Sequence, residues 1–213
     1  MSRPSSSKTV AESQTTLVQL MEITHANIAG IVHGGEVMKL VDTAAGIAAV
    51  KHTGGMAVTV SIDEMSFLHP VHVGDLVSVT ASVNDVGTTS LEVGVRVEVE
   101  DVIGGERRHT SSGYLVFVAL DDEGKPRPVP RLVTKTPVER RRQREAKIRR
   151  EMRLAHREAI ESHRRTPEPD GSTSGRSPGV KGRGGKPARS TEPSAVDDAP
   201  DADDEQKPRH LRV

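Results

Sequence analysis

Asp42 has the position in the sequence that most needs a chemical explanation. It lies within residues 34–51, a proline-free segment rich in Ala, with one Met and one Leu, that is typical of a helix. Apolar residues fall on nearly every face of this helix, so other structure should enclose it. Burying a carboxylate costs several kcal/mol unless it is hydrogen-bonded or takes up a proton, and the same desolvation raises its pKa towards the range of a general base near neutrality. The alternative is an Asp42 that reaches solvent or pairs with a basic side chain.

Two glycines stand at the start of this predicted helix, about two turns before Asp42. Gly34 and Gly35 would expose backbone N–H groups at the positive end of the helix dipole, where negative charge is stabilised. A carbonyl that becomes a tetrahedral oxyanion needs such donors, although a glycine pair can also simply begin a helix. Asn27, in the preceding connection, could orient water or a carbonyl, but Asn in loops usually forms turns.

The histidines and the lack of cysteine limit the other chemistries. His25 and His33 could each cap or orient a neighbour, and neither has a partner in sequence that would indicate a general base. His69 and His72 have a metal-like spacing, but Pro70 separates them and a third ligand is missing, so we expect no metal site. The chain has no cysteine, which excludes disulfides, thiolate metal ligands and a Cys nucleophile.

The elements around these residues predict one sheet and one central helix. A strand is expected over residues 15–23, an irregular connection over 24–32, and further strands at the ranges 56–67, 76–86, 90–101 and 106–120. Within 90–101, Leu91 and every second residue to Val99 are apolar, and the residues between are polar or glycine, which indicates a sheet with one wet face. Turn residues fall at the expected strand ends. The prediction is an α+β domain in which a long antiparallel sheet wraps around a buried helix.

The C-terminal third has a different composition. Residues 138–163 are helical in composition, with a narrow apolar stripe that leaves this helix either frayed or docked on a neighbour, and with Glu145 placed for an i,i+4 pair with Arg149. The apolar stripe of this helix consists of Ile148, Met152, Ala155 and Ala159.

Residues 166–213 are expected to be a disordered tail, and residues 1–12 a flexible N-terminus. Between them, residues 13–133 are expected to form the folded domain.

Charge is distributed in blocks although the chain is neutral overall. Residues 137–165 contain 11 Lys or Arg against 5 acids, and residues 192–213 contain 7 acids against 3 bases. Such blocks usually form a solvated helix and a disordered tail. No apolar run approaches the roughly 20 residues that cross a bilayer, and no secretory leader is recognisable, so we expect a cytoplasmic protein without a membrane segment.

One stretch resembles a known family. Residues 24–42 read THANIAGIVHGGEVMKLVD, which is similar to the signature of hotdog acyl-CoA thioesterases of the brain acyl-CoA hydrolase type and their single-domain bacterial relatives. The resemblance continues through 59–67, 70–75 and 86–90, and through FVALD at 117–121 with the proline-rich segment after it. It covers about residues 18–132, and the ordered set is specific where any one piece would be weak.

The resemblance implies a single hotdog domain that hydrolyses fatty acyl-CoA to fatty acid and CoA. Asp42 matches the family's helix carboxylate, a general base or nucleophile, and Asn27 its loop amide that positions water or thioester. Gly34 and Gly35 match the amides near the thioester oxygen. The turn Gly87, Thr88, Thr89 and Ser90 is expected to contact the pantetheine or phosphates of CoA.

The resemblance also implies how the sites are assembled. Family sites draw the Asn and the Asp from two paired hotdog domains, so a homodimer of this chain would form two equivalent sites, expected within a trimer of dimers. CoA enters as part of the substrate, and no other cofactor is implied. The segment 137–213 has no family counterpart that can be carried over.

Two alternatives use the same residues differently. A hydratase or dehydratase acting on acyl thioesters would need a His and carboxylate pair across the substrate, and no hydratase motif surrounds His33. A binding protein without catalysis could use the arginine-rich helix to hold nucleic acid or an acidic membrane. Only three aromatic residues are available for stacking on bases, and the extreme C-terminus is acidic, which counts against nucleic acid as the main partner.

Overall fold

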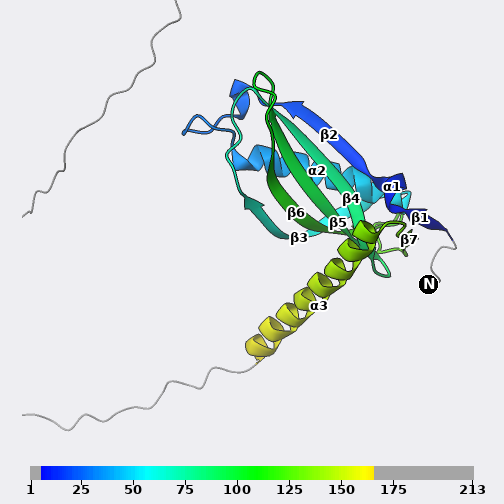
Figure 1. The fold of residues 1–213 in the computed structure, drawn as a ribbon. Helices are drawn as coiled ribbons and strands as arrows, with labels where there is room; N and C mark the ends of the chain where they lie inside the picture. The colour runs from blue at the N-terminus through cyan, green and yellow to red at the C-terminus, as the bar shows by residue number, and fades with distance from the viewer. Residues whose placement is uncertain (1–5, 166–213) are drawn as a thin grey trace, which may run out of the picture. The chain divides into compact units, whose positions relative to one another are not determined.

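The computed structural model describes residues 6–165, which contain a five-stranded antiparallel sheet with a helix on each face (Figure 1). The strand order is β2-β4-β5-β6-β3, so β2 and β3 form the two edges. This arrangement confirms the predicted α+β class. The five strands are β2 (Thr15–Leu20), β3 (Ala57–Phe67), β4 (Asp75–Val86), β5 (Ser90–Asp101) and β6 (Arg107–Ala119).

The central helix α2 (Gly34–Thr53) packs its apolar side on the inner face of the sheet. Strand residues of the predicted alternation, such as Leu91 and Val93, meet it there at 0% exposure. Phe117 of β6 is the largest fully buried side chain and lies beneath the helix near Gly46. The helix ends at Gly54, whose φ of 69° is the left-handed conformation that favours glycine. The buried positions of α2 are Val37, Val41, Ala44, Ala45, Ala48, Ala49, His52 and Thr53.

The opposite flank of α2 is open, which corrects the prediction of a fully enclosed helix. Met38, Ile47 and Val50 are 39%, 36% and 43% exposed. One sheet covers only one side of a helix, so a single chain cannot enclose a helix that is apolar all round. The open flank continues onto edge strand β3, where Ile62 and Phe67 are exposed, whereas Val58 and Val60 lie on the outer face of the sheet. Within the described residues β3 pairs only with β6, so its outer edge carries no strand.

The N-terminal segment is partly ordered, which corrects the expectation of a flexible N-terminus for residues 7–12. Strand β1 (Ser7–Thr9) pairs in parallel with β7 (Arg131–Val133), and the short helix α1 (Val10–Ser13) follows it. Val10 is buried at 6% exposure, which anchors this segment. A single 3-10 turn, η1 (Ile23–His25), opens the connection to α2.

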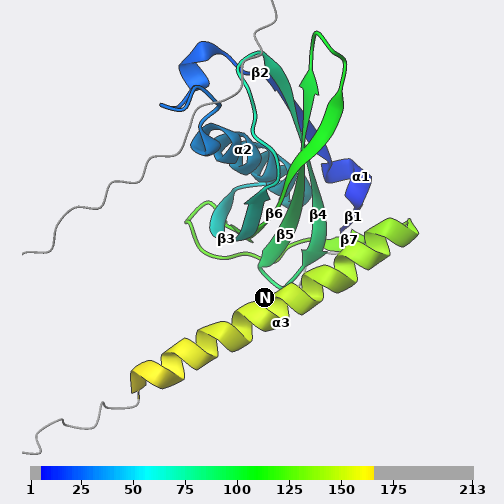
Figure 2. The same ribbon diagram turned by 60° about the vertical axis from the view of Figure 1, so that its left-hand side comes forward.

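Helix α3 (Pro137–Arg165) crosses the outer face of the sheet at the end where the β4–β5 hairpin turns (Figure 2). The predicted stripe does not make this contact: Ile148 and Met152 are 56% and 66% exposed. Ala146, at 1% exposure, and a row of arginines face the sheet instead. Glu145 bonds to Arg141 rather than to Arg149, because Arg149 is engaged by the sheet. The predicted tail, 166–213, lies outside the described residues.

Helix α3 shields part of the outer face of the sheet from solvent. Glu92 was expected on the wet side of β5 but is 1% exposed beneath α3, while Arg96 and Glu98 further along the strand remain open to solvent. Across residues 6–165 no helix is both long enough and apolar enough to span a bilayer.

Candidate functional site: two half-sites along one helix

Asp42 is held on the open flank of α2 beside the free edge of the sheet. The Thr59 hydroxyl donates a hydrogen bond to Asp42 Oδ1 with an oxygen to oxygen distance of 2.7 Å. Both residues are exposed in the single chain, which corrects the prediction that Asp42 is buried. Because Thr59 occupies only one carboxylate oxygen, the other can accept a proton or attack a carbon. We call Asp42 and Thr59 the acid half-site.

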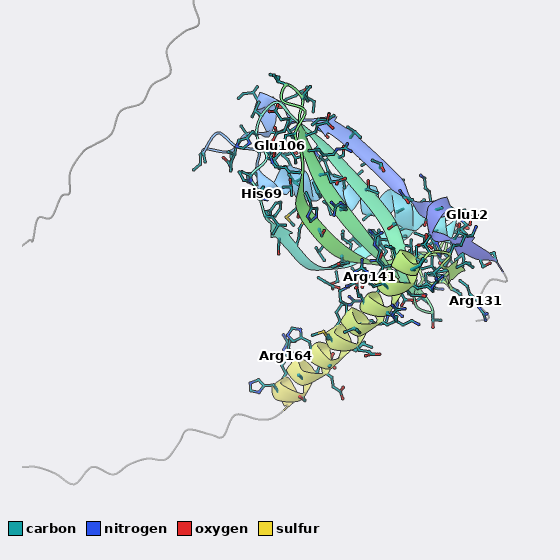
Figure 3. All side chains as sticks on the ribbon, viewed as in Figure 1. Glu12, His69, Glu106, Arg131, Arg141 and Arg164 are labelled. Carbon is teal, nitrogen blue, oxygen red and sulfur yellow. The ribbon has the colours of Figure 1, made fainter. Side chains whose placement is uncertain are left out.

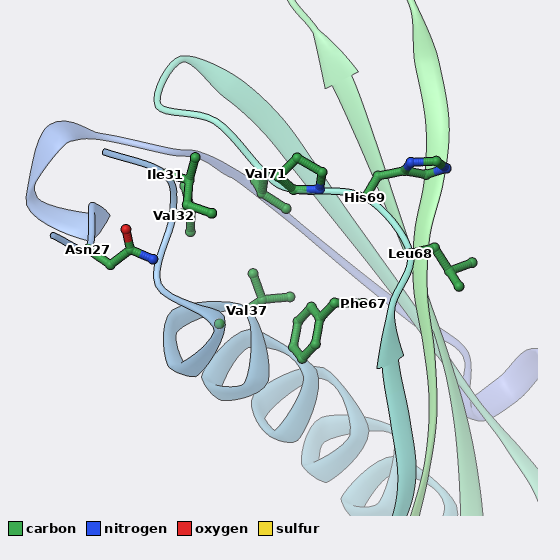
Figure 4. Close-up of a pocket in the computed structure, with 10 residues that line it drawn as sticks. Asn27, Ile31, Val32, Val37, Phe67, Leu68, His69 and Val71 are labelled. Atoms are coloured by element: carbon green, nitrogen blue, oxygen red, sulfur yellow. The ribbon is translucent and has the colours of Figure 1, made fainter. Parts of the chain in front are cut away.

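Asn27 lies at a cavity of about 240 Å³ at the entrance of α2 (Figure 4). Its Oδ1 accepts the N–H of Ala29 at 2.8 Å, so the turn-forming interpretation is correct for the oxygen. Its amide nitrogen has no partner among the described residues, and Figure 4 shows it turned toward the chain that leads into the helix. Asn27 therefore forms a turn and still presents a donor.

The helix entrance offers one free amide where two were predicted. The N–H of Gly35 donates to Nδ1 of His33 at 2.9 Å, so His33 caps the helix and occupies that donor. Gly34 lines the cavity, and its N–H has no partner among the described residues. The Phe67 ring lies close: a Cβ built on Gly34 would be 3.6 Å from Phe67 Cζ. We call Asn27, Gly34 and Phe67 the amide half-site.

The two half-sites do not meet within one chain. Gly34 and Asp42 are eight residues apart on the same helix, which corresponds to about 12 Å along its axis. A reacting carbonyl must lie about 3 Å from both its nucleophile and its oxyanion donors. One chain therefore carries both halves of a site on the same flank, too far apart to act on one carbonyl.

The predicted CoA-binding turn lies elsewhere in the fold. Gly87 and Ser90 close the β4–β5 hairpin through a 2.7 Å bond from the Gly87 N–H to the Ser90 carbonyl. The Thr88 and Thr89 carbonyls accept N–H groups from Val129 and Ala119, so the backbone of the turn is fixed. This turn borders α3, away from the amide half-site.

His25 and His72 have structural partners. Nδ1 of His25 accepts the N–H of Glu22 at 2.9 Å and closes the η1 turn. His72 Nδ1 lies 3.7 Å from Asp75, and His69 lines the cavity with Asn27. Within residues 6–165 no three His, Cys, Asp or Glu side chains cluster closely enough to hold a metal ion.

Sequence reasoning missed Thr59 and Phe67. Threonine is common in strands, and an exposed Thr in an alternating segment carries no signal of its own. Only the tertiary arrangement places its hydroxyl at hydrogen-bond distance from a helix carboxylate 17 residues earlier. Phe67 is one of three aromatic residues, so its rarity was a weak signal that aromatic area is used at a special place.

A sheet that wraps one helix, with a carboxylate on the helix flank and an open amide at the helix entrance, defines a hotdog domain. The thioesterase superfamily model matches residues 29–105. The acyl-CoA thioester hydrolase YciA of Salmonella typhimurium is 38% identical over 110 residues, which span 50% of this chain and 81% of YciA. The chain belongs to the thioesterase superfamily.

Solved structures agree in fold over most of their length. The acyl-CoA hydrolase of Staphylococcus aureus, solved with butyryl-CoA, CoA and CoA disulfide, is 37% identical with a TM-score of 0.68 and covers 74% of this chain and 94% of the hydrolase. An apo-hexameric acyl-CoA thioesterase is 36% identical with a TM-score of 0.69, covering 71% of this chain and 97% of that one.

Variants of the Staphylococcus aureus hydrolase have the same residue types at the same spacing. Three structures carry alanine in place of an asparagine, of an aspartate 15 residues later, and of a threonine 17 residues after that. Asn27, Asp42 and Thr59 have these two spacings in this chain. The acid half-site and the loop amide thus correspond in type and order to positions replaced in that protein.

Proposed function

We propose that the protein is an acyl-CoA thioesterase that hydrolyses fatty acyl-CoA to a free fatty acid and CoA. The observation that carries this proposal is the hydrogen bond from Thr59 to Asp42. It fixes one carboxylate oxygen and leaves the other available, which is the arrangement that a general base or nucleophile requires. Thioester hydrolases with the same fold and the same residue spacing support the choice of substrate.

In the proposed reaction the thioester carbonyl lies between an acid half-site and an amide half-site. Asp42 either removes a proton from an attacking water or attacks the carbonyl carbon itself, and both routes need the same placement. The Gly34 N–H and the Asn27 amide nitrogen donate to the developing oxyanion, where one preorganised donor is typically worth about 3 kcal/mol. The C–S bond then breaks, and the CoA thiolate leaves and takes up a proton. If Asp42 is the nucleophile, water then hydrolyses the acyl–Asp42 anhydride, which releases the fatty acid and restores the carboxylate. No cofactor takes part, because CoA is a portion of the substrate.

The proposed site is shared between two copies of the chain. Two copies that pair antiparallel through the open flank of α2 would place the Gly34 end of one helix beside Asp42 of the other. Pairing would also cover Met38, Val50 and the exposed side chains of β3, whose burial stabilises association by roughly 25 cal/mol per Å². We propose a homo-oligomer of such pairs, a trimer of dimers, that acts in the cytoplasm in fatty acid metabolism; a similar solved thioesterase is hexameric.

A mixing experiment tests both the activity and the sharing of sites. Purified Asn27→Ala and Asp42→Asn variants should each release almost no CoA thiol, since each homodimer lacks the same half of both sites. After the two are unfolded and refolded together, a paired copy with one intact Asn27 and one intact Asp42 at the same site should form. Random pairing restores about one quarter of the wild-type rate, because half the dimers are mixed and each has one intact site.

Refolding each variant alone is the matched control and should restore nothing. A mixture that stays as inactive as its components would exclude a site shared in this way. An Asp42→Asn variant that retains the parent rate of thiol release would remove the thioesterase mechanism itself.

A further inference from the structure

The entrance of α2 is held by hydrogen bonds that converge on His33, a residue outside both half-sites. The His33 N–H donates to the carbonyl of His25 at 2.8 Å, and the His33 carbonyl accepts the N–H of Glu36 at 2.9 Å. The side chain adds a third bond, because its Nδ1 accepts the N–H of Gly35. His33 is therefore bonded to the preceding loop and to the first turn of the helix at the same time.

The loop that carries Asn27 is fixed to His33 by main-chain contacts. Ala26 and Val32 form an antiparallel bridge, and the N–H of Asn27 donates to the Ile31 carbonyl at 2.8 Å. Together with the main-chain bond that His33 itself makes to this loop, these contacts close a narrow hairpin. The position of Asn27 relative to the His33 backbone is thus set without any side chain.

The first turn of α2 depends on the His33 side chain instead. The N–H groups at a helix N-terminus have no acceptor within the helix, and an uncapped first turn is less stable than a capped one. The ring caps Gly35 and leaves the Gly34 N–H, which has no partner among the described residues, as the available donor. Because Nδ1 must keep a lone pair for this bond, the ring proton lies on Nε2.

Gly35 provides the space that this cap needs. A Cβ built on Gly35 would lie 2.9 Å from His33 Nδ1 and 3.1 Å from its Cε1, so a side chain there would displace the ring. Gly35 lies within the helix, a conformation that any residue adopts, so the backbone itself does not require glycine. The absence of a side chain at this position is explained by the approach of the imidazole.

We propose that His33 is a positioning residue of the thioesterase reaction. Its ring holds the first turn of α2 against the hairpin, which fixes the Gly34 N–H relative to the Asn27 amide so that both donors meet the same developing oxyanion. His33 itself does not touch the substrate. The inference rests on the proposed thioesterase function and adds to it the group that sets the geometry of its donors.

The kinetic test removes the acceptor and then restores it. His33→Ala should lower kcat for an acyl-CoA about tenfold and leave KM within about twofold, because displaced donors stabilise the oxyanion less and the bound thioester hardly at all. His33→Asn, whose Oδ1 is a favoured helix cap, should recover most of the loss. Gly35→Ala should lower kcat as His33→Ala does, since it displaces the ring without removing it.

A cap on the other long helix provides the matched control. Thr136 Oγ1 accepts the N–H of Glu139 at 3.2 Å at the start of α3, so Thr136→Ala removes a side-chain cap of the same kind. Figure 3 shows α3, marked by Arg141 and Arg164, away from His69, which lines the cavity of the amide half-site. This variant should change neither kcat nor KM.

Hydrogen exchange at the Gly35 amide measures the cap independently of turnover. Exchange should be faster in His33→Ala and close to the wild-type rate in His33→Asn. An active enzyme in which His33→Ala keeps its kcat, or in which His33→Asn loses as much as His33→Ala, would overturn the positioning role and leave the thioesterase intact. A wild type that releases no CoA thiol, although its Gly35 amide shows the expected exchange, would reject the thioesterase and with it the role of His33 in catalysis.

Discussion

The two faces of the sheet hold their helices by different forces. On the inner face, α2 is attached by aliphatic side chains around Phe117, and most contacts there are apolar. On the outer face, α3 is attached by arginines that reach buried acids, with Ala146 as the one fully buried apolar residue of the helix among those described. Apolar burial is non-directional, whereas ion pairs require a defined geometry and depend on the charge of both partners. The comparison indicates that α2 supports the domain as a whole and that α3 is a separable addition.

The Arg149 contact shows how the outer attachment works. Its guanidinium stacks over the Tyr114 ring at 3.6 Å while it bonds to Glu92. Burial alone would lower the pKa of Arg149, but the hydrogen bond and the charge of Glu92 outweigh it and raise that pKa. Removing one partner of such a pair leaves the other buried charge uncompensated, which is more costly than the pair is stabilising.

The largest effect is expected from the inner face. Phe117→Ala should lower the free energy of unfolding by about 3–5 kcal/mol, because it leaves a cavity under α2 where the sheet cannot collapse. Chemical denaturation at a fixed protein concentration measures this loss. Phe117→Leu is the control and should cost less than about 1.5 kcal/mol. Equal losses for the two variants would mean that the volume under α2 does not determine the stability of the domain.

A smaller and more local effect is expected from the outer face. Glu92→Gln should weaken the docking of α3 by about 2 kcal/mol, because Arg149 and Arg153 lose a charged acceptor. Hydrogen exchange should rise in the amides of α3 and stay unchanged in α2. Glu98→Gln, on the same strand but in an exposed pair, should change neither helix. Faster exchange in α2 as well would show that the two faces are coupled.

The smallest effect is expected from the one buried ionisable group of α2. Burial lowers the pKa of His52 below its ordinary value of 6.5, although a bond to the Pro130 carbonyl opposes this. The folded state therefore favours the neutral ring, and the unfolded state binds more protons just below pH 6.5. Stability should be complete above that pH and decrease as the pH falls toward the folded pKa, by at most about 1.4 kcal/mol per unit.

Denaturation of the wild type and of His52→Gln across pH 5 to 7 (roughly the window around an unperturbed His) isolates this contribution. The variant keeps a donor for Pro130 but should lose the acid-dependent part of the profile. If both proteins show the same dependence on pH, the titrating group lies elsewhere.

The elements of the domain followed from local patterns. Helix α2 begins where the predicted helix over 34–51 begins and extends two residues further. Each predicted strand is present, with ends shifted by a few residues. Alternation from Leu91 to Val99 correctly identified the inner face, because side chains alternate in a strand whatever packs on it. The same pattern could not reveal that α3 covers Glu92, since a period of two assigns residues to faces and not the environment of each face.

The candidate site was only partly accessible to sequence reasoning. Asp42 was selected because a carboxylate in an apolar helix needs compensation, and that compensation is a hydroxyl on a strand rather than burial within the chain. Asn27 was selected through family resemblance, since an Asn in a loop has no signal of its own. The sequence predicted two free N–H donors at the helix entrance, at Gly34 and Gly35. The N–H of Gly35 is occupied because it donates to His33, and the sequence did not identify His33 as the helix cap.

By itself the sequence determined the secondary structure, the inner core and the residue types capable of chemistry, because these depend on interactions between near neighbours and on periodicity. Only the tertiary structure decided that Thr59 reaches Asp42, that Gly34 and Asp42 are too distant to act together in one chain, and that α3 covers Glu92. Those facts depend on contacts between segments far apart in sequence, and no local pattern specifies which distant side chains meet.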